Sequence, residues 1–363
     1  MAKRVSVDKT LFAVTLLLVF SGLVMVFSAS AVVAQERFDS PYTFLLRQLA
    51  WATAGLTAMV VAMNFDYRRY KHPAVVFSLL GVTTALLVAV LFLDRSHNTH
   101  RWIRLGALSF QPSELAKPAI ILFLAYFLET RTRAINDWRG TLLPAVIPTV
   151  IFASLIVIQP DLGTAMVVVA ITACLLFVGG MRLRYFAYAF AASLVPLYFL
   201  IFRVQWRYER ILAFLNPYSD PQGRGFHIIQ SLIAVGTGGV GGVGLMEGKQ
   251  KLFYLPEPHT DFLFAVVAEE TGLIGSLAVL ALFTIFLYRG MRTAALTRDP
   301  FARFLAAGVT AMVVVQAFLN VSVVLGLLPT KGIPLPFLSY GGSSLFVTLA
   351  SVGVLLNITQ HTD

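Results

Sequence analysis

Residues 10–34, TLFAVTLLLVFSGLVMVFSASAVVA, form a predominantly apolar stretch that contains no charged residue. A helix needs about 20 apolar residues to cross the hydrocarbon core of a bilayer, so this stretch is long enough to span a membrane. It is also longer than the apolar core of a cleaved signal peptide, which takes about 7–15 residues. We therefore interpret it as a first membrane span that stays in the protein.

Nine further stretches of the same kind follow. Hydrophobic residues make up 58% of the 363 residues and charged residues only 13%, whereas soluble domains average about 25% charged residues. Such a composition excludes a disordered chain and leaves too few charges to cover a soluble multidomain enzyme. We predict an all-α polytopic membrane protein with about ten transmembrane helices, as a single domain over residues 1–363. The expected spans are 10–34, 44–63, 73–93, 113–129, 142–158, 162–180, 186–202, 262–288, 305–328 and 342–359.

The basic residues predict how these spans are oriented. If the N-terminus lies in the cytoplasm, 15 of the 28 Lys and Arg residues fall on the cytoplasmic side, in short loops or the N-terminal tail. The opposite side receives 11, six of them in residues 203–262. By the positive-inside rule, which holds best for short loops, both termini are cytoplasmic. The net charge of +10 is thereby partly explained without nucleic acid, and the external basic residues indicate an external anionic ligand.

Residues 203–262 form the one large extracytoplasmic loop of this arrangement. Connections longer than about 12–15 residues are usually functional or disordered, and this one carries too many apolar residues to be disordered. Residues 206–217 mix basic and apolar residues at helical spacing, which predicts an interfacial amphipathic helix; Arg207 or Arg210 could also meet a lipid phosphate. The glycine-rich residues 236–244 predict either a flexible or re-entrant turn or an anion-binding loop of free N–H groups.

Residues 249–262, KQKLFYLPEPHTDF, hold the densest cluster of residue types used in catalysis. Ionisable side chains at the edge of a span are costly and are candidates for function. Asp261 stands at the mouth of the span 262–288, where it could also serve as an N-terminal cap. Glu257 and His259 are either part of the same site or exposed loop residues.

Two pairs of charged residues lie within spans. Glu269 and Glu270 are adjacent and point to different sides, so one of them is expected to pair with a basic group elsewhere. Glu114 and Lys117 are neighbours on one helix face at i,i+3 spacing. That spacing predicts either an internal salt bridge or a lysine that lines a polar cavity. Arg101 belongs to an external segment, RWIRLG, that leads into this helix.

Residues 329–344, PTKGIPLPFLSYGGSS, contain prolines and glycines that forbid a regular helix. Irregular backbone beside a bilayer is tolerated only when it is buried in protein or lines a cavity. Lys331 would then present a cation in that cavity; the alternative is a solvated lysine at the membrane edge. Ser343 lies at the end of the same block.

Together these blocks resemble the SEDS family (shape, elongation, division and sporulation), the bacterial peptidoglycan polymerases. The resemblance covers nearly the whole chain, from Val24 to the final span. Residues 251–257 and 329–332 are more similar to the FtsW branch of the family than to RodA. The most specific pieces are Asn216-Pro217 with Asp220-Pro221, then 225–231, 255–262 and 336–344.

The resemblance implies a glycosyltransferase that joins lipid II into glycan strands on the outer face of the bacterial cytoplasmic membrane, for septal wall synthesis in cell division. It implies Asp261 as the essential acid. It also implies a class B penicillin-binding protein transpeptidase and other divisome proteins as partners, beside membrane lipids. Candidate contacts for the pyrophosphate or sugar are Lys117, Lys331, Arg101, Glu114, His259, Glu257, Arg210 and Ser343. No cofactor is expected with certainty, and Mg²⁺ or Mn²⁺ at the pyrophosphate is a further hypothesis without visible metal-ligand spacing.

The chemistry of a carboxylate agrees with a catalytic role for Asp261. A sugar hydroxyl is a poor nucleophile, and a general base assists it by about 10²–10⁴-fold. An exposed Asp has a pKa of about 3.9, and partial desolvation would raise it and make Asp261 a better base. The competing hypotheses are a flippase for lipid-linked precursors, a RodA-like elongation polymerase and a non-catalytic scaffold. Transporters tend to show internal repeats; none is evident here, and the polar residues crowd on the outer side.

Overall fold

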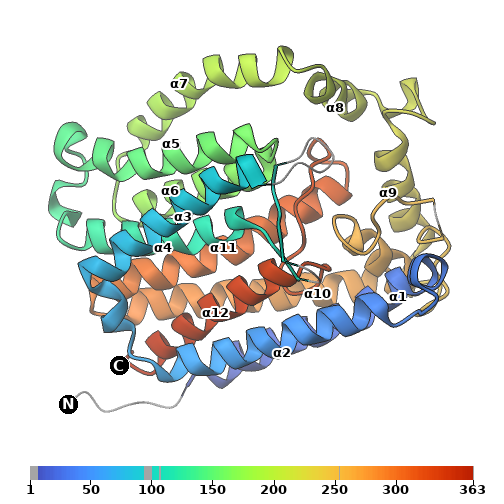
Figure 1. Cartoon of the computed structure of the whole chain (residues 1–363), viewed down its shortest axis with the longest axis horizontal. Coiled ribbons are helices and arrows are strands. Elements are labelled where there is room, and N and C mark those ends of the chain that lie inside the picture. The colour runs from blue at the N-terminus through green and yellow to red at the C-terminus, as the bar shows by residue number, and fades with distance from the viewer. Residues whose placement is uncertain (1–6, 94–99, 106–107, 253, 363) are drawn as a thin grey trace.

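The computed structural model describes residues 7–93, 100–105, 108–252 and 254–362. Within them the chain is mostly helical, and each of the ten predicted spans overlaps a long helix (Figure 1). The polytopic helical fold is therefore confirmed. The helices at the spans are α1 (Lys9–Phe38), α2 (Thr43–Asn64), α3 (Pro73–Leu93), α4 (Pro112–Glu129), α5 (Leu143–Ile158), α6 (Leu162–Val178), α7 (Leu183–Phe202), α10 (Leu263–Leu296), α11 (Pro300–Val324) and α12 (Gly342–Thr359).

Eight of these ten segments, as far as the chain is described, are long and apolar enough to cross a membrane by length and composition. The two that fall short are α4, which carries Glu114, Lys117 and Glu129, and α6, which has 17 residues. Both helices pack against α11. Glu114 and Lys117 are buried in the protein, whereas Glu129 at the end of α4 pairs with Lys71. Polar groups at membrane depth are tolerated in such surroundings. The protein is a multi-pass membrane protein.

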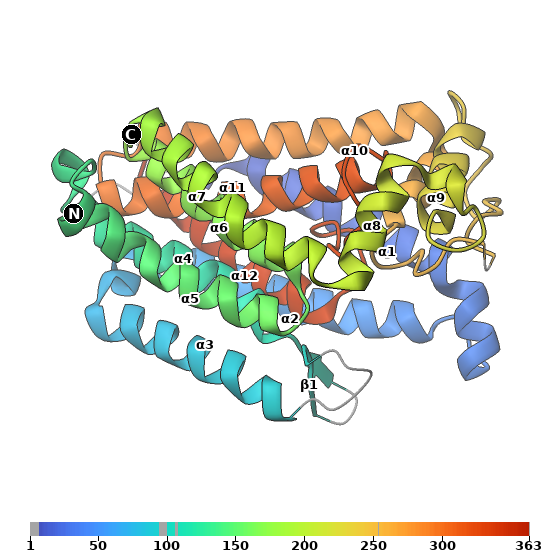
Figure 2. The ribbon, with the colours of Figure 1, turned by 90° about the horizontal axis from the view of Figure 1, so that it is seen from above.

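The bundle is built around α11 and α12, most of whose residues are buried. α12 packs along α2, while α10 and α4 flank α11. α7 differs from the rest: none of its residues is buried, and it stands apart at the edge of the bundle (Figure 1). α1 begins and α12 ends at the same end of the bundle (Figure 2), where Asp8 N donates to Thr359 Oγ1 at 3.2 Å. An even number of spans requires this arrangement.

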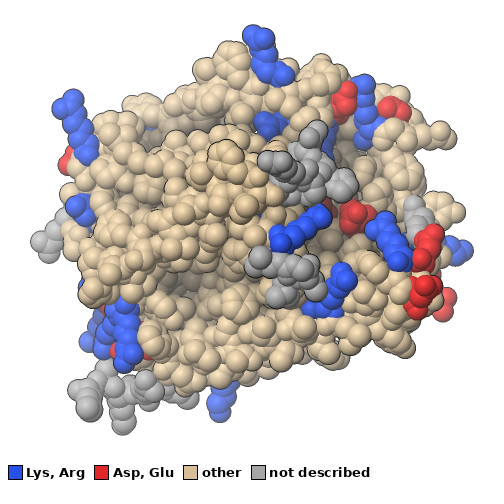
Figure 3. Space-filling view, in the orientation of Figure 1, with Lys and Arg blue, Asp and Glu red and all other residues tan. Residues whose placement is uncertain are grey.

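Charged side chains avoid the middle of the bundle. On the face shown in Figure 3, most Lys, Arg, Asp and Glu side chains gather toward the two ends, and a broad uncharged area lies between them. Large apolar side chains are exposed on the helices, among them Phe77 and Phe92 of α3. This division is what a helical bundle needs when lipid surrounds its middle and water its ends.

The segment predicted as one large loop, residues 203–262, contains two helices, α8 (Gln205–Leu215) and α9 (Phe226–Thr237). α8 is the helix that the amphipathic pattern predicts. An antiparallel hairpin of β1 (Ile103–Leu105) and β2 (Leu108–Phe110) is the one sheet among the described residues. It is a small departure from the all-α prediction, and it lies in the connection between α3 and α4.

The glycine-rich residues 236–244 form a turn that packs against a break in α10. Gly272 has φ 64° inside that helix, a conformation that favours glycine. The main-chain groups freed at this break bind the turn. Leu273 N donates to Gly239 O at 2.9 Å, and the carbonyl oxygen of Glu269 accepts from Val243 N at 3.0 Å. The segment is therefore a turn packed on α10, and the N–H groups of Val243 and Gly244 bind main-chain oxygens of that helix.

Candidate active site

Asp261 lies in the loop directly before α10 and is partly accessible to solvent. Its main-chain oxygen accepts a hydrogen bond of 2.8 Å from Asn320 Nδ2 on α11. Across the described residues its carboxylate takes part in no hydrogen bond or ion pair. α10 begins at Leu263 and has no side-chain cap, so the capping alternative for Asp261 is not what the structure shows.

Two cavities meet at Asp261. The first, the α8–α9 cavity, has a volume of about 330 Å³ and is lined by those two helices and the loop before α10. The second, the α6–α7 cavity, has a volume of about 390 Å³ and has an apolar wall that includes Met166 of α6 with Leu197 and Ile201 of α7. Residues common to both linings are Trp206, Arg210, Asp261, Thr330, Lys331 and Gly332.

Three cations surround the carboxylate from different elements. Arg210 of α8 is held by a hydrogen bond of 3.2 Å from its Nη1 to Thr330 O. Lys331 follows Thr330 in the loop before α12 and lines both cavities. Arg101 lines the α6–α7 cavity, where its Nε donates to Gln159 O at 3.0 Å. This set of side chains can bind an anion on the surface that also holds Asp261.

Burial raises the pKa of Asp261 from 3.8 to about 7. The negative charges of Glu257 and Asp161 contribute to this rise in pKa, and the positive charges of Arg101 and Arg210 oppose it. A carboxyl group with a pKa near 7 is ionised in about half of the molecules at neutral pH, and such a group is suited to accept a proton in catalysis.

The pKa of Lys331 is shifted in the opposite direction to that of Asp261. Burial and the neighbouring Arg210 lower its pKa from 10.5 to about 8, so it stays mostly protonated at neutral pH. The site therefore combines one base that is not neutralised by a direct ion pair with cations that lie around it. That combination suits the transfer of a proton from a neutral nucleophile beside an anionic leaving group.

The comparisons with known proteins identify the family. The FtsW/RodA/SpoVE group, described as cell cycle proteins, matches residues 8–363. The chain belongs to this family. A Geobacter metallireducens protein named peptidoglycan glycosyltransferase FtsW is 44% identical over 98% of this chain and 95% of its own length. Stage V sporulation protein E of Bacillus subtilis is 43% identical over 99% of both chains.

Solved structures of the family have the same fold. A chain of a peptidoglycan synthase complex, studied for its coordination of polymerisation and crosslinking, superimposes with a TM-score of 0.81 at 33% identity, covering 99% of this chain and 100% of that one. Rod shape determining protein RodA of Thermus thermophilus gives a TM-score of 0.70 at 29% identity, with 98% and 97% covered. The predicted resemblance to SEDS proteins is confirmed.

The structure brings together part of the predicted site of this family member. Asp261, Lys331, Arg210 and Arg101 line the α6–α7 cavity, and Glu257 lines the α8–α9 cavity. Their roles toward a substrate stay predictions.

Lys117 and Glu114 lie elsewhere. Lys117 Nζ is 2.7 Å from Glu114 Oε2 and 2.7 Å from Gln316 Oε1, and the lysine is 1% exposed. The internal salt bridge expected from the i,i+3 spacing is therefore confirmed. Neither residue lines the two cavities at Asp261, because each is turned into the interface of α4 with α11. Their contact with a substrate stays a prediction.

His259 and Ser343 are also outside the two cavities. His259 is buried, with its ring centroid 4.7 Å from that of Phe44 and 5.7 Å from that of Tyr340. Ser343 is buried in the first turn of α12, and its Oγ accepts a hydrogen bond of 3.3 Å from Gln111 N. The ring of His259 packs on two aromatic rings and the hydroxyl of Ser343 binds the main chain of Gln111, so both side chains hold together elements around the site.

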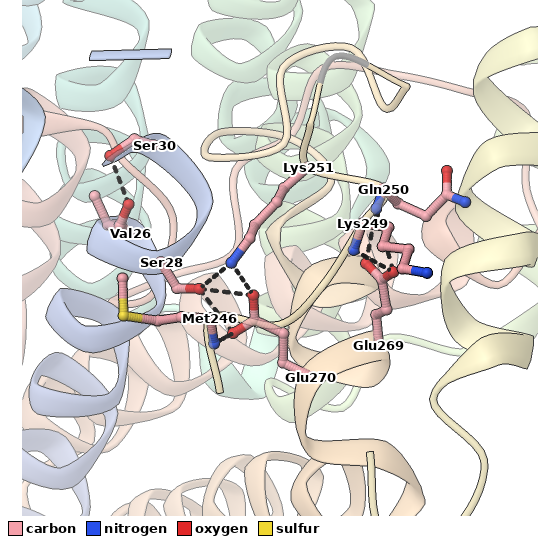
Figure 4. Close-up of polar contacts among 9 residues, drawn as sticks. All are labelled: Val26, Ser28, Ser30, Met246, Lys249, Gln250, Lys251, Glu269 and Glu270. Atoms are coloured by element: carbon pink, nitrogen blue, oxygen red, sulfur yellow. Dashed lines mark hydrogen bonds and ion pairs between the residues drawn. The ribbon is translucent and has the colours of Figure 1, made fainter. Parts of the chain in front are cut away.

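The acids of α10 form a second polar cluster, shown in Figure 4. Glu270 is 2.6 Å from Lys251 Nζ and accepts hydrogen bonds from Ser28 Oγ at 2.6 Å and from Met246 N at 3.0 Å. Glu269 points to the other side and accepts from Lys249 N at 2.8 Å. The expectation that one of the two acids pairs with a distant base is confirmed. The two carboxylates anchor the loop that leads to Asp261.

Sequence reasoning missed three residues at the site. Asp161 caps α6, accepting from Thr164 N at 3.0 Å, and lines the α6–α7 cavity; a cap after a turn-forming proline was the available signal. Gln316 and Asn320 are buried amides of α11. Polar residues four apart in an apolar span are unusual enough to have indicated a role.

Proposed function

We propose that this protein is a peptidoglycan glycosyltransferase that polymerises lipid II on the outer face of the cytoplasmic membrane. The observation that carries the proposal is the Asp261 carboxylate, without a direct ion pair among the described residues and with a pKa raised to about 7, where the two cavities meet. Membership of the family supports it, as do relatives named peptidoglycan glycosyltransferase FtsW.

In the proposed reaction Asp261 acts as the general base. The carboxylate takes the proton from the 4-hydroxyl of the acceptor sugar while that oxygen forms a bond to the anomeric carbon of the donor. The bond from this carbon to the pyrophosphate oxygen breaks, and the electron pair leaves with undecaprenyl pyrophosphate. Displacement from the opposite face converts the α-linked donor into a β-linked product. The proton on Asp261 then passes to water.

The surroundings of Asp261 fit a lipid-linked pyrophosphate. Lys331, Arg210 and Arg101 supply positive charge for the leaving group, and such charge acts more strongly where water is limited. The α6–α7 cavity adds an apolar wall beside these cations, which suits the junction of a phosphate with a prenyl chain. The α8–α9 cavity, lined by Glu209, Arg224 and His227 among others, has the polar lining that a sugar needs.

The cellular setting is part of the proposal. A related chain in a peptidoglycan synthase complex supports a partner that crosslinks the strands, a class B penicillin-binding protein, and relatives named FtsW support the division septum. Mg²⁺ or Mn²⁺ at the pyrophosphate remains a hypothesis. Among the described residues no group of three or more His, Cys, Asp or Glu is placed to hold a metal ion, so phosphate oxygens would supply most ligands.

The test compares Asp261→Asn with wild type and with Glu247→Gln, which removes an exposed carboxylate from the same extramembrane segment. Purified protein, together with its transpeptidase partner, should polymerise fluorescent lipid II. Loss of the base should lower the rate by about 10²–10⁴-fold, and Glu247→Gln should leave it unchanged. Normal polymerisation by folded Asp261→Asn would refute the catalytic assignment. A wild-type protein that moves lipid II across liposomes without polymerising it would establish a flippase instead.

A further inference from the structure

Asn320, near the end of α11, connects the two loops that form the site. Its side chain is 2% exposed. Nδ2 donates to Asp261 O at 2.8 Å and to Ile333 O at 2.7 Å. Both partners are carbonyl oxygens, which only accept, so the atom that faces them has to be the amide nitrogen.

The two loops come from distant parts of the chain and touch at the site. Asp261 precedes α10, whereas Lys331 and Ile333 belong to the connection between α11 and α12. Gly332 packs directly on the carboxylate: a Cβ at this glycine would lie 2.8 Å from Asp261 Oδ2. The base and the cation of Lys331 are therefore placed relative to one another by this contact and by the amide of Asn320.

A second amide, one helical turn earlier, continues the same support. Gln316 Nε2 donates to Pro334 O at 2.9 Å, and Gln316 Oε1 accepts from Lys117 Nζ at 2.7 Å. Lys117 in turn pairs with Glu114. At i,i+4 spacing the two amides share one face of α11. This face binds the loop of Lys331 at two successive points, and the buried ion pair holds Gln316 in place.

The amide of Asn320 is not arranged for stability alone. Its Oδ1 is buried and has no hydrogen-bond partner in the described part of the chain. An unsatisfied buried acceptor costs about 1–3 kcal/mol. A polar residue kept in a span at such a cost is a candidate for function, and the function visible here is the placement of Asp261.

We infer that Asn320 is a positioning residue for the transfer reaction: it holds the main chain of Asp261 and the loop of Lys331 at a fixed separation, so that the base meets the hydroxyl while the cation meets the leaving group. The inference rests on the proposed function. Misplacement of a reacting group by about 1 Å costs about 10²-fold in rate. Asn320 acts through Asp261, so its loss should lower kcat more than it raises KM.

The chain offers a matched control for the test. Asn357 of α12 is 0% exposed and clamps a loop in the same way, with Nδ2 donating to Met63 O at 2.8 Å and Oδ1 accepting from Tyr67 N at 2.9 Å. It lies at the opposite end of the bundle from Asp261. Asn320→Leu and Asn357→Leu therefore remove equivalent buried amides, one at the site and one remote from it.

We expect both variants to lose thermal stability in detergent, and only Asn320→Leu to lose about 10–100-fold in kcat for lipid II polymerisation, with KM within about twofold of wild type. If Asn320→Leu does not fold, Asn320→Ser takes its place, because a hydroxyl is too short to reach both carbonyls and should give the same split. Gln316→Leu should give a smaller fall in kcat.

Several outcomes would overturn the inference. Equal kcat in Asn320→Leu and Asn357→Leu would show a general effect of lost stability. A loss confined to KM would place Asn320 in substrate binding. In either case an inactive Asp261→Asn beside an active wild type leaves the proposed function standing. A wild type that does not polymerise lipid II overturns the proposed function and this inference together.

Discussion

Glu270 and Asp261 are two acids of one segment that the structure treats in opposite ways. Glu270 is 1% exposed, and its oxygens receive Lys251, Ser28 and the amide of Met246. Asp261 is nine residues earlier in the chain, at a cavity with cations around it, yet none of the described cations forms a direct ion pair with it. A carboxylate with a full set of partners stabilises the fold, because protonating it would break its ion pair and weaken its hydrogen bonds. One without them is free to exchange a proton.

The paired acids of α10 hold the loop that leads to Asp261. The network of Glu270 fixes the loop from Met246 to Lys251, and Glu269 fixes Lys249 from the other side. Buried polar networks of this kind are rigid when all members are satisfied. The fixed residues 246–251 therefore help to place Asp261, which lies further along the same loop, against α11.

The largest loss of stability that we expect comes from Glu270→Gln. This substitution leaves Lys251 buried without its counter-charge, and breaking a buried pair by removing one partner costs about 3–5 kcal/mol. The melting temperature in detergent should fall accordingly, and activity should fall with the folded fraction.

The control is the double variant Glu270→Gln, Lys251→Met, which removes both charges. Buried pairs replaced by apolar residues are often neutral in stability, so the double variant should recover most of the lost melting temperature. A double variant as unstable as the single one would contradict the assignment of the ion pair as the main contact of Glu270.

A smaller effect concerns the pH dependence of Asp261. A base with a pKa of about 7 must be ionised to act, so kcat should fall about tenfold per pH unit below 7. Above a pH of about 8 kcat should fall again, because Lys331 loses its charge. Glu257→Gln removes a charge that raises the pKa of Asp261 and should move the fall on the acid side to lower pH. A pH profile that is identical in the two proteins would contradict the coupling of Glu257 to the base.

The raised pKa also has a consequence for stability with a definite sign. The folded protein binds a proton on Asp261 between pH 3.8 and about 7 more tightly than the unfolded chain does. Asp261 therefore contributes stability below its unfolded pKa, and this contribution is lost as the pH rises through the folded pKa. The melting temperature of Asp261→Asn minus that of wild type should therefore be larger at pH 8 than at pH 5.

The helices could be predicted from the sequence because a membrane leaves few alternatives. A backbone in lipid has to satisfy its own hydrogen bonds, so an apolar stretch of sufficient length becomes a helix. The pair Glu114–Lys117 could be predicted for a similar reason, since i,i+3 spacing alone brings the side chains together. The break in α10 at Gly272 could not, because its partners are the distant amides and carbonyls of residues 239–244.

The site was predictable in its residue types and not in its assembly. The block around Asp261 stands out by polarity at the mouth of a span, and so does Lys331 among prolines. Their proximity depends on Gly332 packing on the carboxylate and on Asn320 reaching two carbonyls. Such contacts leave no periodic pattern in the sequence, and neither does the hydrogen bond between Lys117 and Gln316 of α11.

The smallest effect comes from a third kind of acid, one in a solvent-exposed pair. Glu129 Oε1 is 2.5 Å from Lys71 Nζ, as short as the pair of Glu270, but the lysine side chain is 45% exposed. Pairs of this kind contribute about 0–1 kcal/mol, because water and salt screen them and ordering two long side chains costs entropy. Glu129→Gln should therefore shift the melting temperature far less than Glu270→Gln and leave kcat unchanged. A shift as large as that of Glu270→Gln would mean that distance, and not burial with a full set of partners, decides what an acid does in this fold.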